Sequence, residues 1–368
     1  MKQRTILLLI TTFDMGGAER VYIQLARGLA ERGYRVIAAC LQARSGTVAR
    51  ELAAAPVTVV DLHVSSKFDV SGFRRLVRLL RRNDVDIVYT FLIHPHLLGR
   101  LAARLTRVPV VLSSQQTMLY ENGALEWANR VTARWCGVVV AVSRNVERYL
   151  AEQVGLPRSK LVTIYNSVDA RQLRKAAFRP HGPGEGPVIG YCARLTPEKD
   201  HPGLIAAVKI VKAQHPGVRL LLAGDGPEHE RLVRIVNDEH MGDTVRFLGH
   251  VSDVAAFYAG LDLYVQASYV EGLPCAVLEA LACCLPVVAT RVGGNEEIID
   301  NGDTGMLVPP RDPAALADAM LWMTAHPDEA REMGTRGRRT VEDRFSAEAM
   351  VAATDALITS LSQRRTAL

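Results

Sequence analysis

The sequence predicts an α/β protein of two domains, each a doubly wound parallel sheet with helices on both faces. Short apolar runs alternate with amphipathic segments along the chain, as expected of parallel strands joined by helical crossovers. The 368 residues are long for one domain and sufficient for two, each with its own core. Residues 178–187, rich in Pro and Gly, interrupt the alternation and predict an interdomain linker.

Apolar runs bounded by turn residues predict seven strands in the first half and six in the second. The first-half runs are residues 5–10, 35–40, 57–61, 87–91, 110–113, 137–142 and 161–164. The second-half runs are residues 188–191, 218–223, 245–248, 261–266, 286–289 and 306–308. We therefore expect one Rossmann-like domain in residues 1–175 and another in residues 176–350. Residues 351–368 form a last helix, for which packing back on the N-terminal domain is one expected position.

The composition is that of a soluble globular protein, with 48% hydrophobic and 23% charged residues. No apolar run approaches the roughly 18 residues of a membrane-spanning helix, and residues 5–10 are too short for a signal peptide. We expect a cytoplasmic protein, with peripheral contact at the inner face of the cell membrane as the alternative. The six cysteines lack C-x-x-C spacing, which favours reduced packing residues over a metal site.

Positive charge is concentrated in the first half of the chain. Residues 1–170 have a net charge of +10 and the remainder −5, which together give the +5 of the whole chain. The basic residues gather most densely in residues 73–82, which read as an amphipathic helix carrying Arg74, Arg75, Arg78, Arg81 and Arg82. Such a helix suits an anionic membrane or an anionic acceptor, and a solvated helix face explains it equally well. Nucleic acid is disfavoured because aromatic residues are not interleaved with the basic ones.

Residues 268–280 hold the most informative pattern, two glutamates eight positions apart across a Gly-Leu-Pro break. A strand precedes the pattern, Pro274 suits the first turn of a helix, and residues 275–282 read as that helix. Glu271 is therefore expected on the loop and Glu279 within the first helical turns. Backbone N–H groups of residues 273–276 suit an anion, and the carboxylates suit hydroxyl groups. The pattern predicts a sugar nucleotide site.

Two further pairs of residues are candidates for binding phosphate. Arg194 and Lys199 lie between a strand ending near residue 191 and a helix opening near residue 200, where two cations can converge on a diphosphate. Gly16 and Gly17 follow the first strand and open a helix, which allows close approach of backbone N–H groups. Surface charge and a plain turn would explain each pair taken alone. No G-x-G-x-x-G follows the first strand, so a dehydrogenase loses its main support.

These motifs together resemble those of retaining glycosyltransferase family 4. Residues 271–279 resemble its E-x7-E motif, residues 13–20 its N-terminal glycine loop, and residues 190–200 its phosphate-binding Arg and Lys. Further similar segments follow in the family's order, at residues 222–228, 247–251, 293–297 and 305–310. The resemblance covers nearly the whole chain and implies the GT-B fold, two Rossmann-like domains facing across a cleft. The first would bind the acceptor and the second the nucleotide sugar.

The resemblance also implies roles for individual residues. Glu271 would bind hydroxyls of the donor sugar, Glu279 the ribose diol, and Arg194 and Lys199 the diphosphate during bond cleavage. The remaining implied donor-binding residues are Gly16, Gly17, His250, Val251, Gly272, Leu273, Pro274 and Cys275, with the backbone of His250 and Val251 beside the base.

The resemblance places His94 near the transferred sugar, and a structural histidine is the alternative. Family members often carry histidine where this chain has Tyr89 and Phe91, and asparagine where it has His96, so this corner departs from the family pattern.

The family resemblance implies that no metal or other cofactor is needed. Asp84 and Asp86 mimic a metal-binding D-x-D, but they immediately precede a strand far from the diphosphate motifs, so a turn is expected there.

The expected function is retaining transfer of a sugar from a UDP- or GDP-sugar to a glycan or lipid-linked acceptor, with bacterial polysaccharide or lipopolysaccharide assembly as the favoured setting. Three alternatives stay open. A sugar phosphorylase would use free phosphate, a nucleotide-sugar 2-epimerase would need further acid and base carboxylates, and a non-catalytic nucleotide-sugar-binding module would bind without turnover.

Overall fold

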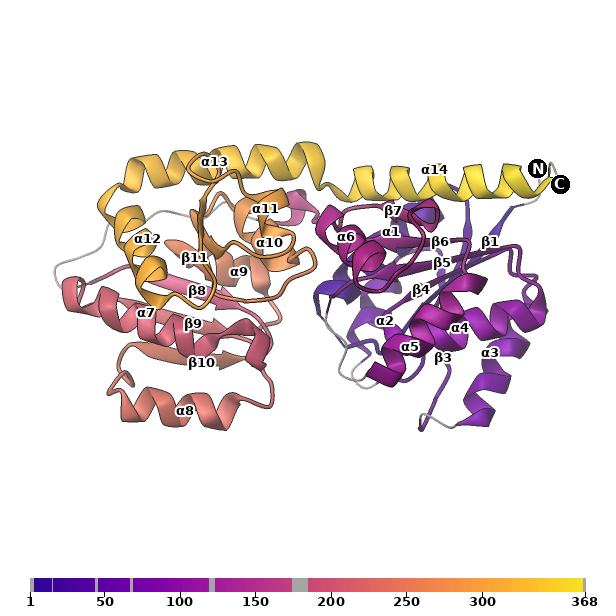
Figure 1. The fold of residues 1–368 in the computed structure, drawn as a ribbon, viewed down its shortest axis with the longest axis horizontal. Helices are drawn as coiled ribbons and strands as arrows, with labels where there is room; N and C mark the ends of the chain where they lie inside the picture. Colours follow the sequence, from indigo (N-terminus) through magenta and orange to yellow (C-terminus); the bar gives the residue numbers. More distant parts are fainter. Residues whose placement is uncertain are drawn as a thin grey trace. The chain divides into compact units, whose positions relative to one another are not determined.

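The computed structural model describes residues 3–14, 16–43, 46–66, 69–118, 123–173 and 185–366, and the side chains of residues 364–366 are left out. The chain forms two compact units, residues 1–167 with 347–368, and residues 168–346 (Figure 1). The chain enters the second unit before the expected boundary at residue 175. Residues 174–184, which include most of the predicted linker, lie outside the described residues.

The first unit contains a seven-stranded parallel sheet in the order β3-β2-β1-β4-β5-β6-β7. Its strands are β1 (Thr5–Ile10), β2 (Arg35–Cys40), β3 (Val57–Asp61), β4 (Ile87–Phe91), β5 (Val110–Gln115), β6 (Val138–Ala141) and β7 (Leu161–Thr163). The β1 and β4 residues are all buried, which is why these strands read as continuous apolar runs in the sequence.

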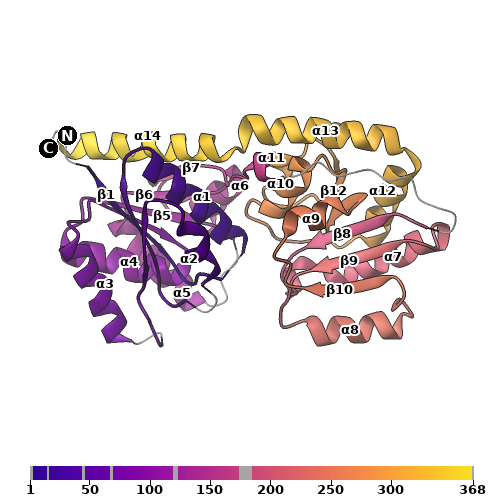
Figure 2. The ribbon, with the colours of Figure 1, turned by 180° about the vertical axis from the view of Figure 1, so that it is seen from behind.

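Helices cover both faces of this sheet, with α3, α4 and α5 on one face and α1 and α2 on the other (Figures 1 and 2). The helices are α1 (Gly17–Glu31), α2 (Thr47–Leu52), α3 (Val70–Arg82), α4 (Ile93–Thr106), α5 (Gly123–Thr132) and α6 (Arg144–Glu152), with short 3-10 turns η1 (Ala133–Trp135) and η2 (Arg158–Lys160). The right-handed crossovers of a doubly wound sheet produce this change of face where the strand order reverses.

The last helix, α14 (Ala347–Thr366), belongs to the first unit and packs on α1. A Cβ at Gly28 would lie 2.5 Å from Cγ2 of Val351, so glycine permits the close approach of the two helices. The hydroxyl of Tyr34 donates to Oδ1 of Asp355 at 2.6 Å. These contacts attach the end of the chain to the N-terminal sheet.

The second unit contains a six-stranded parallel sheet in the order β10-β9-β8-β11-β12-β13. Its strands are β8 (Val188–Cys192), β9 (Arg219–Ala223), β10 (Val245–Gly249), β11 (Leu263–Gln266), β12 (Val287–Thr290) and β13 (Met306–Val308). Its helices are α7 (His201–Gln214), α8 (His229–Asp238), α9 (Val254–Ala259), α10 (Cys275–Ala282), α11 (Asn295–Ile298), α12 (Pro313–Ala325) and α13 (Pro327–Arg344), with 3-10 turns η3 (Ala170–Gln172) and η4 (Pro197–Lys199).

Both sheets confirm the predicted fold class of two doubly wound parallel sheets. Each sheet has one point where the strand order reverses, between β1 and β4 in the first and between β8 and β11 in the second. In open α/β sheets, ligands bind at this switch point, beyond the carboxyl ends of the strands. The loops after β1, β4, β8 and β11 are therefore the places to look for a site, and each of them holds predicted site residues.

Candidate active site

Lys199 and Glu271 meet at the switch point of the second sheet. Lys199 ends the 3-10 turn η4 after β8, and Glu271 lies on the loop between β11 and α10. The Nζ atom of Lys199 lies 2.6 Å from Oε1 of Glu271, and their side chains are 17% and 8% exposed. Burial strengthens such a charge-assisted bond, because little water competes for either partner.

Two more side chains donate to the same oxygen of Glu271. The hydroxyl of Ser268 lies 2.6 Å from Oε1, and Nε2 of Gln266, the last residue of β11, lies 3.1 Å from it. Among the described residues, Oε2 of Glu271 has no hydrogen-bond partner, and it keeps contact with solvent. The carboxylate thus has one anchored oxygen and one available oxygen.

A buried tyrosine, Tyr191, contacts two of the residues that bind Glu271. The hydroxyl of Tyr191, from β8, lies 2.8 Å from Oγ of Ser268 and 3.1 Å from the carbonyl oxygen of Lys199. Burial and the nearby Glu271 carboxylate raise the pKa of Tyr191 well above its ordinary value, so the phenol stays a hydrogen-bond donor. His201, at the start of α7, packs against the Tyr191 ring, with centroids 5.0 Å apart and ring planes tilted by 32°.

The loop after β12 supports the backbone at Glu271. Gly293 has a φ of +51°, and a Cβ there would lie 1.9 Å from the carbonyl oxygen of Glu271. The N–H of Gly294 donates to the carbonyl oxygen of Gly272 at 3.0 Å. Only glycine fits these positions, so the Gly-Gly pair fixes the loop that carries the carboxylate.

Glu279 lies on α10, one turn beyond the residues that open the helix. Its side chain is buried, and Oε2 accepts a hydrogen bond from the hydroxyl of Tyr258 at 2.9 Å. Helix α10 begins at Cys275 with Pro274 as its N-cap, and Gly272, Leu273 and Pro274 are buried in the loop before it. The predicted helix 275–282 has these bounds in the structure.

Arg194 is placed differently from Lys199. Its side chain is 76% exposed, and its Nη2 lies 3.6 Å from Oε1 of Glu198. The structure therefore brings Lys199, but not the guanidinium of Arg194, into the buried cluster around Glu271. The exposed Arg194 remains available to a ligand that approaches from solvent.

Backbone contacts join the loops that follow β8, β9 and β10. The N–H of Leu195 donates to the carbonyl oxygen of Asp225 at 3.0 Å, and the N–H of Gly224 to that of Gly249 at 2.8 Å. Gly224 has a φ of +134°, and a Cβ there would lie 1.9 Å from the carbonyl oxygen of Ala193. His250 and Val251, which follow β10 directly, thus share the carboxyl edge of the sheet with Arg194 and Lys199.

Gly16, Gly17 and His94 lie at the switch point of the first sheet. Gly16 is the N-cap of α1, which follows β1, and His94 is in the first turn of α4, which follows β4. Strands β1 and β4 are parallel neighbours, with Leu9 opposite Thr90, so these residues share one edge of the sheet. They belong to the other unit from Glu271.

His96 and Asp86 both make hydrogen bonds within the fold of the first unit. Nδ1 of the buried His96 lies 2.8 Å from Oγ1 of Thr90, and burial with the nearby Arg100 lowers the pKa of His96 well below its ordinary value. Oδ2 of Asp86 accepts from the N–H of Thr5 at 2.8 Å, at the amino edge of the sheet. Within the described ranges, no group of three or more His, Cys, Asp or Glu side chains is arranged to hold a metal.

Helix α3 carries the predicted basic face with one departure. Arg74, Arg78, Arg81 and Arg82 are exposed, whereas Leu76 and Leu80 are buried. Arg75 instead binds its own domain, because its Nε donates to the carbonyl oxygen of Leu62 at 2.7 Å and its Nη2 to that of His63 at 2.8 Å. In the part of the chain that is described, no helix is long and apolar enough to span a membrane.

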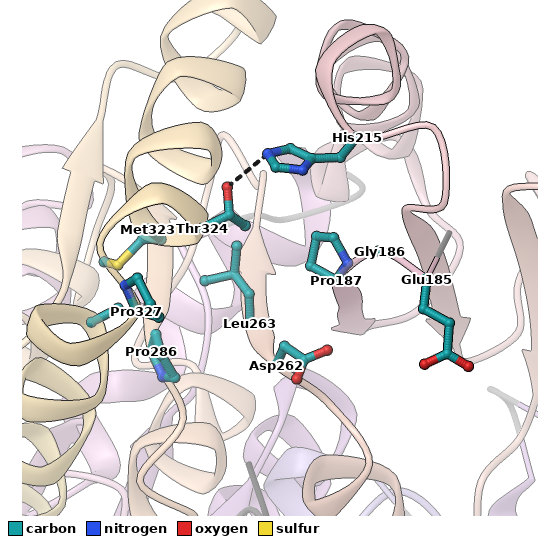
Figure 3. A pocket seen from close by; sticks show the side chains of 11 residues that line it. Glu185, Gly186, Pro187, His215, Asp262, Leu263, Pro286, Met323, Thr324 and Pro327 are labelled. Atoms are coloured by element: carbon teal, nitrogen blue, oxygen red, sulfur yellow. Dashed lines mark hydrogen bonds between the residues drawn. The ribbon is translucent and has the colours of Figure 1, made fainter. Parts of the chain in front are cut away.

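A cavity of about 250 Å³ lies in the second unit away from these residues (Figure 3). Its lining includes Pro187, Asp262 and Pro286, which directly precede β8, β11 and β12, so it lies at the amino edge of the sheet. Figure 3 shows His215 and Thr324 on one side, with His215 Nε2 3.4 Å from Thr324 Oγ1. None of the predicted site residues lines this cavity.

The predictions from sequence missed the residues that hold the glutamates. Ser268 lies three residues before Glu271, and Gln266 is a polar residue that ends an apolar strand. Tyr191 and Tyr258 lie within apolar segments, so the sequence pattern indicates only that they are core residues. A buried polar residue at the carboxyl end of a parallel strand is the signal that points to the first two.

Two family models match the chain, one in each half. The model described as Glycosyltransferase Family 4 matches residues 15–172, and the model described as Glycosyl transferases group 1 matches residues 174–340. Together they cover residues 15–172 and 174–340, which include all the predicted site residues.

Similar proteins and solved structures agree with these family matches. The chain is 29% identical over 354 residues to N-acetyl-alpha-D-glucosaminyl L-malate synthase of Bacillus anthracis, covering 92% of each chain. It is 30% identical over 295 residues to a GDP-mannose-dependent alpha-(1-6)-phosphatidylinositol monomannoside mannosyltransferase of Mycolicibacterium smegmatis, covering 74% of this chain and 75% of the relative. The structure of Anabaena HepE in complex with UDP and glucose shares the fold, with a TM-score of 0.85 and 20% identity over 97% of this chain and 100% of HepE.

Proposed function

The chain belongs to glycosyltransferase family 4 and is a glycosyltransferase with the GT-B fold, and we propose that it transfers a hexose from a UDP- or GDP-sugar with retention of configuration. The observation that carries the proposal is the buried Lys199–Glu271 pair, 2.6 Å apart at the switch point of the second sheet. It combines a cation suited to a diphosphate with a carboxylate suited to sugar hydroxyls.

The reaction that we propose proceeds on one face of the sugar. The bond between the anomeric carbon and the diphosphate oxygen breaks, and the acceptor hydroxyl oxygen bonds to that carbon on the same face. The acceptor proton passes to the leaving phosphate oxygen, which needs no further base. The sugar becomes oxocarbenium-like while negative charge grows on the diphosphate, so the protein must stabilise both.

We assign the residues of the second unit to these two demands. Lys199 and Arg194 stabilise the leaving diphosphate, together with backbone N–H groups at the start of α10. Glu271 binds hydroxyls of the transferred sugar through Oε2. Glu279, fixed by Tyr258, binds the ribose diol, and the backbone of His250 and Val251 borders the base.

In the first unit, we propose a donor-binding role for Gly16 and Gly17 and a catalytic role for His94. The proposal rests on their shared edge of the first sheet, at its switch point. No metal or other cofactor is required by this assignment, because side-chain cations and helix N–H groups supply the positive charge.

We propose an anionic acceptor. The first half of the chain has a net charge of +10 in residues 1–170, opposite in sign to the remainder. The names of the two relatives include L-malate and phosphatidylinositol monomannoside, which both carry negative charge. A glycan or lipid-linked intermediate of bacterial surface polysaccharide or lipopolysaccharide assembly fits this chemistry.

We also propose peripheral contact with the inner, cytoplasmic face of an anionic membrane. Arg74, Arg78, Arg81 and Arg82 are exposed along α3, which packs on α4. On the same face of the sheet, Leu105 of α4 is 53% exposed and Trp127 of α5 is 67% exposed (Figure 1). Exposed basic residues together with exposed Trp and Leu on one face are typical of proteins that lie on a bilayer surface.

The experiment that tests the proposed function is release of UDP or GDP from UDP-glucose, UDP-N-acetylglucosamine and GDP-mannose. We expect slow hydrolysis of at least one donor, and a loss of about 100-fold in Lys199→Met, because one preorganised cation at the leaving group is removed. Lys209→Met is the matched control, since Lys209 pairs with Glu239 on the exposed side of α7. Binding of a donor without turnover would indicate a binding module instead.

A further inference from the structure

Three donors converge on one oxygen of Glu271, and none of the described residues binds the other. Lys199 Nζ, Ser268 Oγ and Gln266 Nε2 lie 2.6, 2.6 and 3.1 Å from Oε1. A carboxylate oxygen has two lone pairs, so three donors are one more than its lone pairs and leave no room for a further donor. One buried partner would be enough to hold the Glu271 side chain in place. Three donors on the same oxygen are more than that structural purpose requires.

Two hydroxyl hydrogens serve the three contacts behind Glu271. The hydroxyl of Ser268 donates to Oε1 of Glu271, because an ionised carboxylate can only accept. The single phenol hydrogen of Tyr191 lies between two acceptors, the carbonyl oxygen of Lys199 at 3.1 Å and Oγ of Ser268 at 2.8 Å. A chain of donors therefore runs from Tyr191 through Ser268 to Glu271, and such chains polarise each bond in the same direction.

The amide of Gln266 reinforces the same point. Gln266 is 2% exposed, and its Oε1 is a buried acceptor with no partner among the described residues. Turning the amide over would place that oxygen against the Glu271 carboxylate, so the orientation is fixed by the need to donate. Leaving the Gln266 oxygen buried and unpaired lowers stability. In return, this orientation lets the amide nitrogen donate to Glu271.

We infer that Tyr191, Ser268 and Gln266 are positioning residues that, with Lys199, bind Oε1 of Glu271 so that Oε2 alone acts on the donor sugar. The inference rests on the proposed function. It adds the residues that give the two carboxylate oxygens of Glu271 different roles. Without Ser268, Oε1 keeps only Lys199 and Gln266 as donors, so the carboxylate is held less firmly and depends more on the cation that the diphosphate also needs. The three residues touch neither sugar nor phosphate in this assignment.

The test is a comparison of four variants on the donor that the wild type hydrolyses among UDP-glucose, UDP-N-acetylglucosamine and GDP-mannose. Ser268→Ala should lower kcat roughly 10- to 100-fold, as expected for a lost hydrogen bond to a charged group, and Tyr191→Phe and Gln266→Leu should lower it by less. KM for the donor and the Kd of free UDP or GDP should change by less than about threefold, because the phosphate and ribose contacts stay. Thr244→Val, a buried hydroxyl at the amino end of β10, is the control.

Double variants separate positioning from a merely structural role. Tyr191 acts through Ser268, so Tyr191→Phe should add little in the Ser268→Ala background, whereas Gln266→Leu should multiply the loss. In the Glu271→Ala background, Ser268→Ala should have no further effect on kcat. Tyr191→Phe keeps the shape of the core, so it remains informative if Ser268→Ala unfolds.

Two results would overturn the inference, and they differ from each other. If the wild type hydrolyses a donor and Ser268→Ala and Tyr191→Phe stay within twofold of it, or lower kcat equally without Glu271, these residues do not position the carboxylate. If the wild type turns over none of the three donors, the proposed function fails and this inference fails with it.

Discussion

Lys199 is the residue on which the proposed donor site depends most. Its ammonium group has three N–H donors, and among the described residues the structure gives it one hydrogen-bond partner, Oε1 of Glu271. In our assignment, the same cation holds the carboxylate and uses its remaining N–H donors for the diphosphate. An arginine at this position would deliver its charge as a flat fork, which does not fit between two acceptors in the same way.

The two glutamates should differ in what they do when they are replaced. Glu271→Gln keeps an oxygen for the three donors but presents an NH2 group where Oε2 was, so transfer should fall at least 100-fold with little change in nucleotide affinity. Glu279→Ala should instead weaken UDP or GDP binding about 10-fold by removing a ribose contact. Titration calorimetry with UDP and GDP, beside donor hydrolysis, measures both quantities. Equal effects of the two substitutions would contradict the assigned roles.

His201 should make the stability of the second unit depend on pH. Burial, with Lys199 nearby, lowers its pKa to about 4. The unfolded chain then binds more protons than the folded one between pH 4 and the ordinary value near 6.5, so stability falls as the pH falls through that window. The contribution is about 3 kcal/mol between those limits.

Urea unfolding at pH 7.0 and pH 4.5 measures this effect. His201→Phe removes the titrating group but keeps a ring against Tyr191, so the variant should lose less stability on acidification than the wild type. An identical loss in both proteins would show that His201 does not titrate in this way.

At the scale of helices and strands, much was predictable from the sequence. Strands β1 to β4 and helix α10 have the predicted bounds. The residues of β1 and β4 are all buried, so these strands are continuous apolar runs in the sequence. Strand β5 extends beyond its predicted end at residue 113, because Ser114 and Gln115 are polar but buried. Polar residues of this kind break the apolar signal without ending the strand.

The partners of the site residues were less predictable. The positions of Lys199 and Glu271 could be read from their motifs, but the distance between them depends on which strands are neighbours, here β8 and β11. Arg75 shows the same limit, because helical periodicity places it near the basic face while the loop after β3 supplies its carbonyl partners. Spacing along the chain predicts which face of a helix a residue lies on. Its hydrogen-bond partner is determined by tertiary packing.

Helix α3 should bring the protein to anionic membranes. Replacing Arg74, Arg78, Arg81 and Arg82 together by Gln should release it from anionic liposomes at low salt, since each charge near the surface contributes about 1 kcal/mol. Arg75 is left in place because it binds backbone carbonyls. Donor hydrolysis should not change, because α3 carries none of the residues that we assign to the donor.

Liposome flotation measures this, and a charge-matched variant is the control. Arg219, Arg234, Arg246 and Arg339 are exposed arginines of the second unit, and replacing them by Gln removes the same net charge. Equal release of both variants would indicate a response to net charge alone. A wild-type protein that does not float at low salt would leave an anionic acceptor as the reason for the basic first half.

At the scale of the whole molecule, two parallel sheets each place candidate residues at their switch points, and charge is divided between the halves. The chain crosses between the units twice, after Ser167 and after Ser346, and α14 then completes the first unit. The N-terminal and C-terminal segments therefore belong to one folding unit. The donor site is assigned mainly to the other unit, which is continuous in sequence.

Activity should survive removal of divalent metals. The leaving diphosphate requires positive charge, and Lys199, Arg194 and the N–H groups at the start of α10 supply it in our assignment. Donor hydrolysis in EDTA should therefore stay within about twofold of the untreated rate. Complete loss of activity, restored by adding Mn²⁺ or Mg²⁺, would show that a metal carries this role.

The central claim is that the second unit binds a nucleotide sugar at the Lys199–Glu271 pair. Thermal unfolding with UDP-glucose, UDP-N-acetylglucosamine and GDP-mannose tests it directly, because a ligand that binds only the folded state raises Tm by mass action. At about 100 times its Kd, one of these donors should raise Tm by roughly 5 °C or more, and Lys199→Met should lose most of that shift. No shift with any donor, or an unchanged shift in Lys199→Met, would contradict the claim.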